Sequence, residues 1–127
     1  MDKKIKLLII EDDLFLLNMY ASKFELEGFD VVLAEDGEKG WKTTIKEVPD
    51  IILLDIMMPK MNGFEVLEKL KSDDRVSMIP VILLTNLSQK DEIERAMNLG
   101  AADFLIKAHF RPSEVVEKIK KLLNLEQ

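Results

Sequence analysis

The chain has 127 residues, of which 47% are hydrophobic and 33% charged, and this suits one globular domain with its own core. A formal net charge of -6 argues against general binding to nucleic acid or to an anionic membrane, since both need a basic surface. The absence of cysteine excludes disulfides, thiolate zinc sites and cysteine nucleophiles.

No segment has the pattern of a membrane span or a signal peptide. The apolar runs are all well short of the ~20 residues needed to cross a bilayer. The basic N-terminus is followed by only a short apolar run before three acids, Glu11-Asp12-Asp13, interrupt it. We therefore expect a cytoplasmic protein that has no membrane partner.

Five short apolar segments alternate with segments of helical spacing. The predicted strands cover residues 6–10, 30–34, 51–54, 79–84 and 102–106. The inward residues of the helices that follow them run from Leu14 to Phe24, Trp41 to Val48, Phe64 to Leu70, Ile93 to Met97 and Val115 to Leu123. The expected end signals are Asp36, Ser88 and Pro112 at helix starts, and Gly28 and Gly100 at helix ends.

This alternation predicts an α/β fold with five helices covering both faces of a parallel sheet. Parallel neighbours need a right-handed crossover that is long enough to hold a helix, and each segment between the strands has that length. The polar stretch 71–77 is interpreted as a surface loop. Periodicity alone does not give the order of the strands.

The segment from Ile51 to Gly63 is the most informative part of the chain. Four consecutive apolar residues run straight into Asp55 and then into a turn that contains Pro, Asn and Gly. This pattern is typical of a strand that is buried on both faces and that ends at Asp55. Open parallel sheets build their sites at the carboxyl ends of the strands, so Asp55 is a candidate site residue.

Other predicted strands also end in polar residues: Glu11 and Asp12 after the first, Thr85 after the fourth and Lys107 after the fifth. Facing carboxylates raise one another's pKa unless a cation lies between them. Mg²⁺ is suitable because it prefers oxygen ligands and bridges readily to phosphate oxygens. A lysine and a threonine hydroxyl beside it would bind a phosphoryl group, with Asp55 as the nucleophile.

Jointly, these residues resemble the receiver domain of two-component response regulators, of the single-domain chemotaxis type. The resemblance covers essentially the whole chain and is carried by Ile9 to Asp13, Leu53 to Gly63, Leu84-Thr85 and Gly100 to Lys107. It implies a doubly wound, flavodoxin-like sheet with strand order 2-1-3-4-5. It also implies a receiver domain over residues 1–127, and we expect no output domain.

The resemblance implies a set of metal-binding residues around the phosphoacceptor. Asp55 matches the aspartate that attacks a phosphohistidine and becomes an acyl phosphate. Asp12 matches the direct Mg²⁺ ligand, and Glu11 matches the acid that acts through a coordinated water. The remaining protein contacts of the metal would be Asp55 itself and the backbone carbonyl of Met57.

The resemblance also implies a switch and a set of partners. Thr85 matches the hydroxyl that moves to the phosphoryl group, and Lys107 the ammonium that pairs with it. Phe104 matches the aromatic residue that turns inward with Thr85 and remodels the face of the fourth helix, fifth strand and fifth helix. The implied phosphoryl donor is a histidine kinase or a histidine phosphotransferase, and the implied target is a protein docked on that face. The chain would be a monomer or a phosphorylation-dependent dimer, would not bind nucleic acid directly, and would catalyse only its own phosphorylation and dephosphorylation.

Two positions depart from the family pattern. Lys107 is followed by Ala108, where the family has a proline after a cis bond. A non-proline cis bond costs ~3–4 kcal/mol, which favours a trans bond that holds Lys107 less firmly. Asn86 stands where a small residue is usual, and we expect its larger polar side chain to narrow access to Asp55 or to hydrogen-bond near it. These departures are the grounds for an alternative, a degenerate receiver that binds proteins without being phosphorylated.

Met57 and Leu87, two residues after Asp55 and Thr85, bear on the lifetime of the phosphorylated form. Both side chains are apolar and offer no group that could orient an attacking water. We therefore expect the phosphoryl group to be lost slowly.

Two other classes of protein share part of this pattern. A flavin-binding electron carrier has the same architecture, but the acids after the first strand would repel the flavin phosphate. A Mg²⁺-dependent phosphatase places its aspartate nucleophile after the first strand, whereas Asp55 follows the third. Among the remaining polar residues, Asp13 is interpreted as a helix cap, and His109, the only histidine, as an exposed loop residue.

Overall fold

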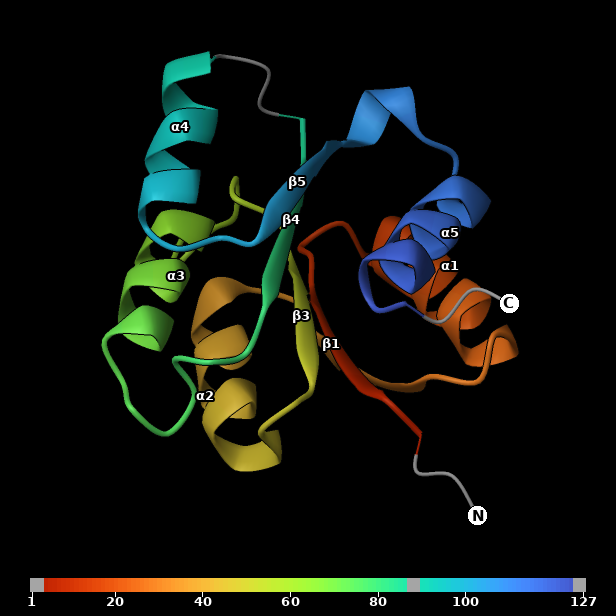
Figure 1. The fold of residues 1–127 in the computed structure, drawn as a ribbon, viewed down its shortest axis with the longest axis horizontal. Coiled ribbons are helices and arrows are strands. Elements are labelled where there is room, and N and C mark those ends of the chain that lie inside the picture. The colour runs from red at the N-terminus through yellow and green to blue at the C-terminus, as the bar shows by residue number, and fades with distance from the viewer. Residues whose placement is uncertain (1–3, 87–89, 125–127) are drawn as a thin grey trace.

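The computed structural model describes residues 4–86 and 90–124, and strands and helices alternate through both ranges (Figure 1). The strands are β1 (Lys6–Ile10), β2 (Asp30–Ala34), β3 (Ile51–Leu54), β4 (Val81–Thr85) and β5 (Asp103–Ile106). The helices are α1 (Leu14–Leu26), α2 (Gly37–Glu47), α3 (Gly63–Lys71), α4 (Lys90–Asn98) and α5 (Pro112–Leu122), with a 3-10 turn, η1 (Lys107–His109), before α5.

The strands form one parallel sheet in the order β2-β1-β3-β4-β5, which confirms the predicted fold and strand order. Helices α1 and α5 cover one face of the sheet, and α2, α3 and α4 cover the other (Figure 1). Each helix in the described part of the chain is too short or too polar to span a bilayer.

The central strands explain why their sequences are continuously apolar. Along β1, Leu8 and Ile10 pack under α2 and α3, while Leu7 and Ile9 pack against α1 and α5. Side chains of a strand point alternately to its two faces, so a strand covered on both faces has no polar positions. Leu7, Leu8, Ile9 and Ile10 are at most 1% exposed, and full burial of such a side chain contributes about 1.5–3 kcal/mol.

Side chains at the helix starts fix where the helices begin. Asp13 accepts hydrogen bonds from the backbone N–H groups of Phe15 (3.0 Å) and Leu16 (3.2 Å), which confirms Asp13 as a helix cap. Asp36 caps α2 in the same way through the N–H of Lys39. The predicted cap Ser88 lies outside the described residues.

The loop before β4 is more firmly held than its polar sequence predicts. Lys71 belongs to α3, and its ammonium donates to the carbonyls of Ser77 (3.0 Å) and Ile79 (3.1 Å). Val76 is buried in the middle of the loop. Strand β4 begins at Val81, later than predicted, because the proline at position 80 has no N–H to donate to the ladder.

Three residues expected to face inward from helices are exposed. Val48 is the C-cap of α2 in a left-handed conformation (φ 43) and is 53% exposed. Leu14 and Leu122 lie in the first turn of α1 and the last turn of α5, where the helix surface is no longer covered by the sheet. Helical spacing predicts the face of a residue but not how far the neighbouring sheet extends.

Candidate functional site

The carboxyl ends of the strands, toward the top of Figure 1, bring the predicted site residues to one edge of the sheet. Glu11 and Asp12 follow β1, Asp55 follows β3, Thr85 is the last residue of β4, and Lys107 follows β5. The register aligns Ile10 with Leu54, so that the residues after them are neighbours. The N–H of Asp55 donates to the carbonyl of Ile10 at 3.0 Å and fixes this alignment.

Three carboxylates gather at the centre of this edge. Glu11, Asp12 and Asp55 each have an oxygen within 4.8 Å of the others. Glu11 is 2% exposed and Asp55 is 6% exposed, whereas Asp12 is open to solvent. Glu11 is held in place by the N–H of Asp13, which donates to its Oε2 at 3.0 Å. The cluster therefore combines two buried acids with one that is exposed to solvent.

Lys107 is the counter-ion of the two buried acids. Its Nζ donates to Oδ2 of Asp55 at 3.0 Å and also forms an ion pair with Oε1 of Glu11. Burial alone would lower the pKa of Lys107, but the hydrogen bond to Glu11 and the charge of Asp55 raise it above its ordinary value. Burial raises the pKa of Glu11, and the hydrogen bond from Lys107 only partly offsets this effect.

The acids fit a hard divalent cation. Among the described residues of this cluster, three carboxylates face one ammonium, so negative charge remains uncompensated even with Lys107 in place. Carboxylate oxygens are the ligands that Mg²⁺ prefers, and the solvent exposure of Asp12 is compatible with the waters that the ion retains. Met57, named from sequence for its backbone carbonyl, lies in the loop after β3 at the same edge.

The candidate switch residues lie on the adjoining strands. Thr85 is buried, and it is aligned with Ile106, the residue before Lys107, so the hydroxyl and the ammonium come from neighbouring positions. Phe104 lies further back on β5, half-buried against the cluster under α2, α3 and α4. Asn86 is exposed at the end of β4, and Leu87 lies outside the described residues.

The departure at Ala108 does not remove Lys107 from the site. None of the described residues has a cis peptide bond, so the bond between Lys107 and Ala108 is trans, as its cost predicted. Even so, Lys107 reaches both buried acids and its side chain is only 10% exposed. The η1 turn carries the chain away from the site, and His109 within it is exposed, as predicted.

Two contacts at the site were missed by the sequence analysis. One is the ion pair of Lys107 with Glu11, which joins opposite ends of the chain. The other is the packing of Gly63, where a Cβ atom would lie 2.5 Å from the carbonyl oxygen of Asp55 and 2.6 Å from Cα of Ile56. The sequence shows Gly63 as a turn residue, but not that the backbone bearing Asp55 packs directly against it.

The comparisons with known proteins identify the class of protein that has this fold. The protein-family model of the response regulator receiver domain matches residues 7–120. The chain therefore belongs to this family of signalling domains. Its members are receivers of two-component systems, and this membership rules against the flavin carrier and the aspartate phosphatase considered above.

Individual relatives are similar over nearly the whole chain. The chain is 37% identical over 118 residues to the DNA-binding dual master transcriptional regulator RpaA of Synechocystis. The matched residues cover 93% of this chain and 48% of that protein. It is 35% identical over 123 residues to the alkaline phosphatase synthesis transcriptional regulatory protein PhoP of Bacillus subtilis, with coverages of 97% and 49%. The chain thus spans about half the length of the curated relatives it matches.

A solved structure has the same fold over its full length. The CheY-like receiver domain protein from Methanospirillum hungatei superimposes with a TM-score of 0.88 at 28% identity, covering 97% of this chain and 96% of that one. The five-stranded order and the placement of the helices are therefore those of a receiver.

Proposed function

We propose that Asp55 accepts a phosphoryl group from a phosphohistidine of a histidine kinase or a histidine phosphotransferase. The observation that carries this proposal is the carboxylate of Asp55, which lies within the acid cluster and is paired with Lys107 at 3.0 Å. In the transfer, an oxygen of Asp55 forms a bond to phosphorus, the bond from phosphorus to the imidazole nitrogen breaks, and the imidazole leaves.

Glu11, Asp12, Asp55 and the backbone carbonyl of Met57 are the groups proposed to hold Mg²⁺. When bound, the ion supplies positive charge to the phosphoryl oxygens. In this assignment Asp12 and Asp55 contact the ion directly and Glu11 acts through a water. This division is the one that the family resemblance implies, and the exposure of Asp12 supports its part because an exposed carboxylate is open to an incoming hydrated ion.

Lys107 and Thr85 are proposed to bind the transferred group. The ammonium of Lys107 already contacts Asp55, so it needs only a small displacement to pair with an oxygen on the phosphorus. The hydroxyl of Thr85 would donate to another oxygen, and Phe104 would follow Thr85 inward because both side chains come from neighbouring strands. The buried position of Thr85 supports this role, since a buried hydroxyl that moves must be replaced by other packing.

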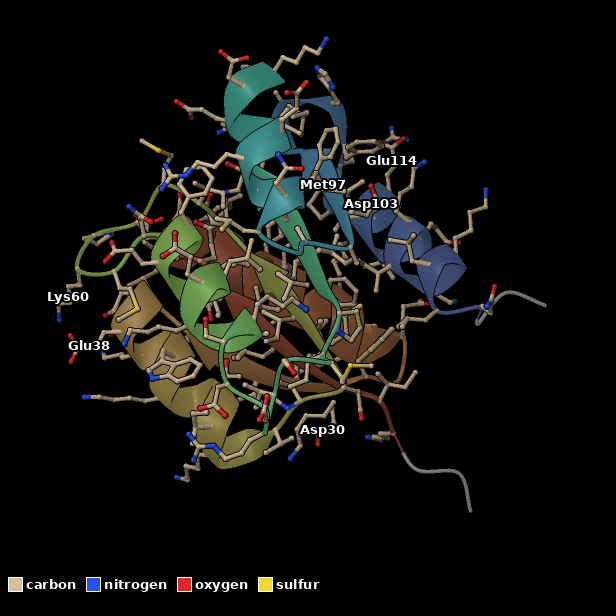
Figure 2. All side chains as sticks on the ribbon, turned by 60° about the vertical axis from the view of Figure 1, so that its left-hand side comes forward. Asp30, Glu38, Lys60, Met97, Asp103 and Glu114 are labelled. Atoms are coloured by element: carbon tan, nitrogen blue, oxygen red, sulfur yellow. The ribbon has the colours of Figure 1, made fainter. Side chains whose placement is uncertain are left out.

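The face made by α4, β5 and α5 is proposed to bind the downstream protein or a second copy of the chain. In Figure 2, Met97, Asp103 and Glu114 come from these three elements and lie on the same side of the view. A surface hollow of about 340 Å³ lies between β5 and α5, and Phe104 is part of its lining. Arg95 of α4 lies over the ring of Phe64, 4.1 Å from its centroid, and so ties α4 to the helix that begins beside Asp55.

The relative RpaA is named as a DNA-binding regulator, and this chain spans about half its length. We propose that the phosphorylated receiver domain itself acts through protein contacts. The net charge of -6 supports this, because DNA would be repelled. The site is proposed to work in the cytoplasm, and to catalyse only its own phosphorylation and dephosphorylation.

The test is the intact mass of the protein after incubation with Mg²⁺ and a small acyl-phosphate donor. We expect the wild type to gain one phosphoryl group that requires Mg²⁺ and is removed by hydroxylamine, and we expect Asp55→Asn to gain none. A wild type that binds Mg²⁺ but gains no mass would favour the degenerate receiver that acts without phosphorylation.

A further inference from the structure

The methionines of this chain are unequally exposed. The sequence has seven, and six lie within the described residues. Met57 is 65% exposed and Met78 is 90% exposed, whereas the other four described methionines are at least half-buried: Met19, Met58, Met61 and Met97. Soluble oxidants reach an exposed thioether first, so Met57 and Met78 are the candidate sites of oxidation among the six described methionines.

The two exposed methionines lie at opposite edges of the sheet. Met57 is two residues after Asp55 at the carboxyl edge, and its Cα is within ~7 Å of the Cα of Asp55 because only two peptide units separate them. Met78 precedes β4 and therefore lies at the amino edge. The described residues thus include two open methionines with the same chemistry, and Met57 is the one that lies two residues from Asp55.

Oxidation changes what Met57 can offer to water. A thioether is a weak hydrogen-bond acceptor, whereas a sulfoxide carries a polar oxygen that accepts strongly. In the reaction with a hydroperoxide, the sulfur forms a bond to one peroxide oxygen and is oxidised by two electrons. The O–O bond breaks, and the other oxygen leaves as water when the peroxide is hydrogen peroxide.

We propose that Met57 is a peroxide-sensitive modification site whose sulfoxide shortens the lifetime of the phosphorylated domain. This proposal rests on the phosphorylation of Asp55 proposed above. Loss of the phosphoryl group requires a water to attack phosphorus, which breaks the bond to Asp55 and releases inorganic phosphate. A sulfoxide oxygen beside Asp55 accepts a hydrogen bond from that water and orients it, which the thioether does not do.

The expected rate follows from one added hydrogen bond. We expect the oxidised protein to lose its phosphoryl group about threefold to tenfold faster than the reduced protein, the factor that one hydrogen bond provides. Met57→Gln, which carries a permanent amide oxygen at this position, is expected to lose the group faster without any oxidant. Met57→Leu has no sulfur, and its rate should be the same before and after peroxide treatment.

The experiment uses the full chain, treated with hydrogen peroxide and mapped by peptide mass for one added oxygen at each methionine. Samples are then phosphorylated with the acyl-phosphate donor, the donor is removed, and the decay of the phosphorylated mass is followed. Met78→Leu is the matched control, because it keeps Met57 and removes the other methionine that is exposed among the described residues. We expect its decay to accelerate on oxidation as in the wild type, and to return to the reduced rate after treatment with methionine sulfoxide reductases.

Equal decay rates of the oxidised and reduced wild type, with Met57 mapped as sulfoxide, would overturn the proposal. It would also be overturned if Met57 resisted peroxide while half-buried methionines were oxidised. If the untreated protein never gained a phosphoryl group, the proposed function itself would fail, and the mapping would still report separately on the access of peroxide to Met57.

Discussion

The amino and carboxyl edges of the sheet differ in how their charged side chains are paired and buried. At the amino edge, Lys6 pairs with Glu47 at 3.1 Å, and the backbone N–H of Lys6 donates to Asp50 at 2.8 Å. The ammonium of Lys6 has one carboxylate partner, Glu47, and both side chains are partly open to water. At the carboxyl edge, Lys107 is paired with two buried acids, and a third, exposed acid belongs to the same cluster.

This difference separates a structural contact from a binding site. A pair such as Lys6 with Glu47, each about 30% exposed, gains little from Coulomb attraction and costs little in desolvation. At the carboxyl edge Glu11 and Asp55 are buried, and burial raises the pKa of Glu11 because the hydrogen bond from Lys107 offsets it only in part. The fold retains unfavourable charge where a cation and a phosphoryl group are proposed to bind.

The largest expected effect is the loss of Lys107. Lys107→Met should lower the free energy of unfolding by about 3 kcal/mol without Mg²⁺, because removing one partner leaves two buried carboxylates facing each other. Lys6→Met, at the amino edge, should cost less than about 1 kcal/mol. Urea denaturation in a chelating buffer compares the two variants, and adding Mg²⁺ should recover part of the loss only for Lys107→Met. Equal losses for both would remove the distinction between the edges.

A second pair of variants tests the packing behind Asp55. Gly63→Ala should destabilise the fold by about 1–3 kcal/mol, since the new methyl group must displace the backbone of Asp55 and Ile56. It should also slow phosphorylation, because the same displacement moves the acceptor. Gly28→Ala, near the amino edge, meets no atom within 4 Å and is strained only through its φ of +92. It should therefore lower stability without changing the phosphorylation rate, as measured by intact mass.

Neutralising Glu11 should change stability in the opposite direction. Because burial raises the pKa of Glu11 in the folded state, its ionised form is less favourable in the fold than in the unfolded chain. Glu11→Gln should therefore increase the melting temperature at neutral pH in the absence of Mg²⁺, while weakening Mg²⁺ binding by about tenfold or more.

The sign of this effect fixes its pH dependence. The stabilising contribution of protonated Glu11 is fully present below its ordinary pKa of 4.5 and is lost as the pH rises through the raised value in the folded protein. The increase in melting temperature of Glu11→Gln over the wild type should thus appear as the pH increases, and it should vanish below pH 4.5. Glu47→Gln, in the partly exposed pair at the amino edge, should show a small change in melting temperature. A gain for Glu11→Gln that persisted in acid would contradict this assignment.

The smallest expected effect concerns the lifetime of the phosphorylated form. Met57→Asn introduces an amide that can orient a water beside Asp55, and it should speed the loss of the phosphoryl group by about threefold to tenfold. Met78→Asn, at the amino edge, should decay as the wild type does. The decay of the phosphorylated mass after removal of the donor measures the rate for both variants. An unchanged rate for Met57→Asn would count against the expectation that the wild type loses its phosphoryl group slowly.

The sequence predicts most of the fold because the strands are buried on both faces and the helices have clear caps. The candidate site could be assembled from sequence because each polar residue directly follows an apolar run, and parallel topology brings the ends of those runs to one edge. The strand order and the residue roles came from family resemblance. The described fold bears out the order, and the roles stay predictions.

Other features depend on tertiary contacts that leave no local signal. The pairing of Lys107 with Glu11 joins residues at opposite ends of the chain, and the close packing of Gly63 depends on the path of the backbone after β3. The exposure of Val48 reflects the left-handed end of α2, which helical periodicity does not contain.

The most direct test of the contrast between the two edges is calorimetric titration of the unphosphorylated protein with Mg²⁺. We expect one binding site in the wild type, its loss in Asp12→Asn, and unchanged affinity in Asp50→Asn at the amino edge. Asp12 is exposed, so its replacement should leave the fold intact, which circular dichroism would verify. No binding in the wild type, or equal affinity in all three proteins, would contradict the claim that the carboxyl edge keeps its excess negative charge for a divalent cation.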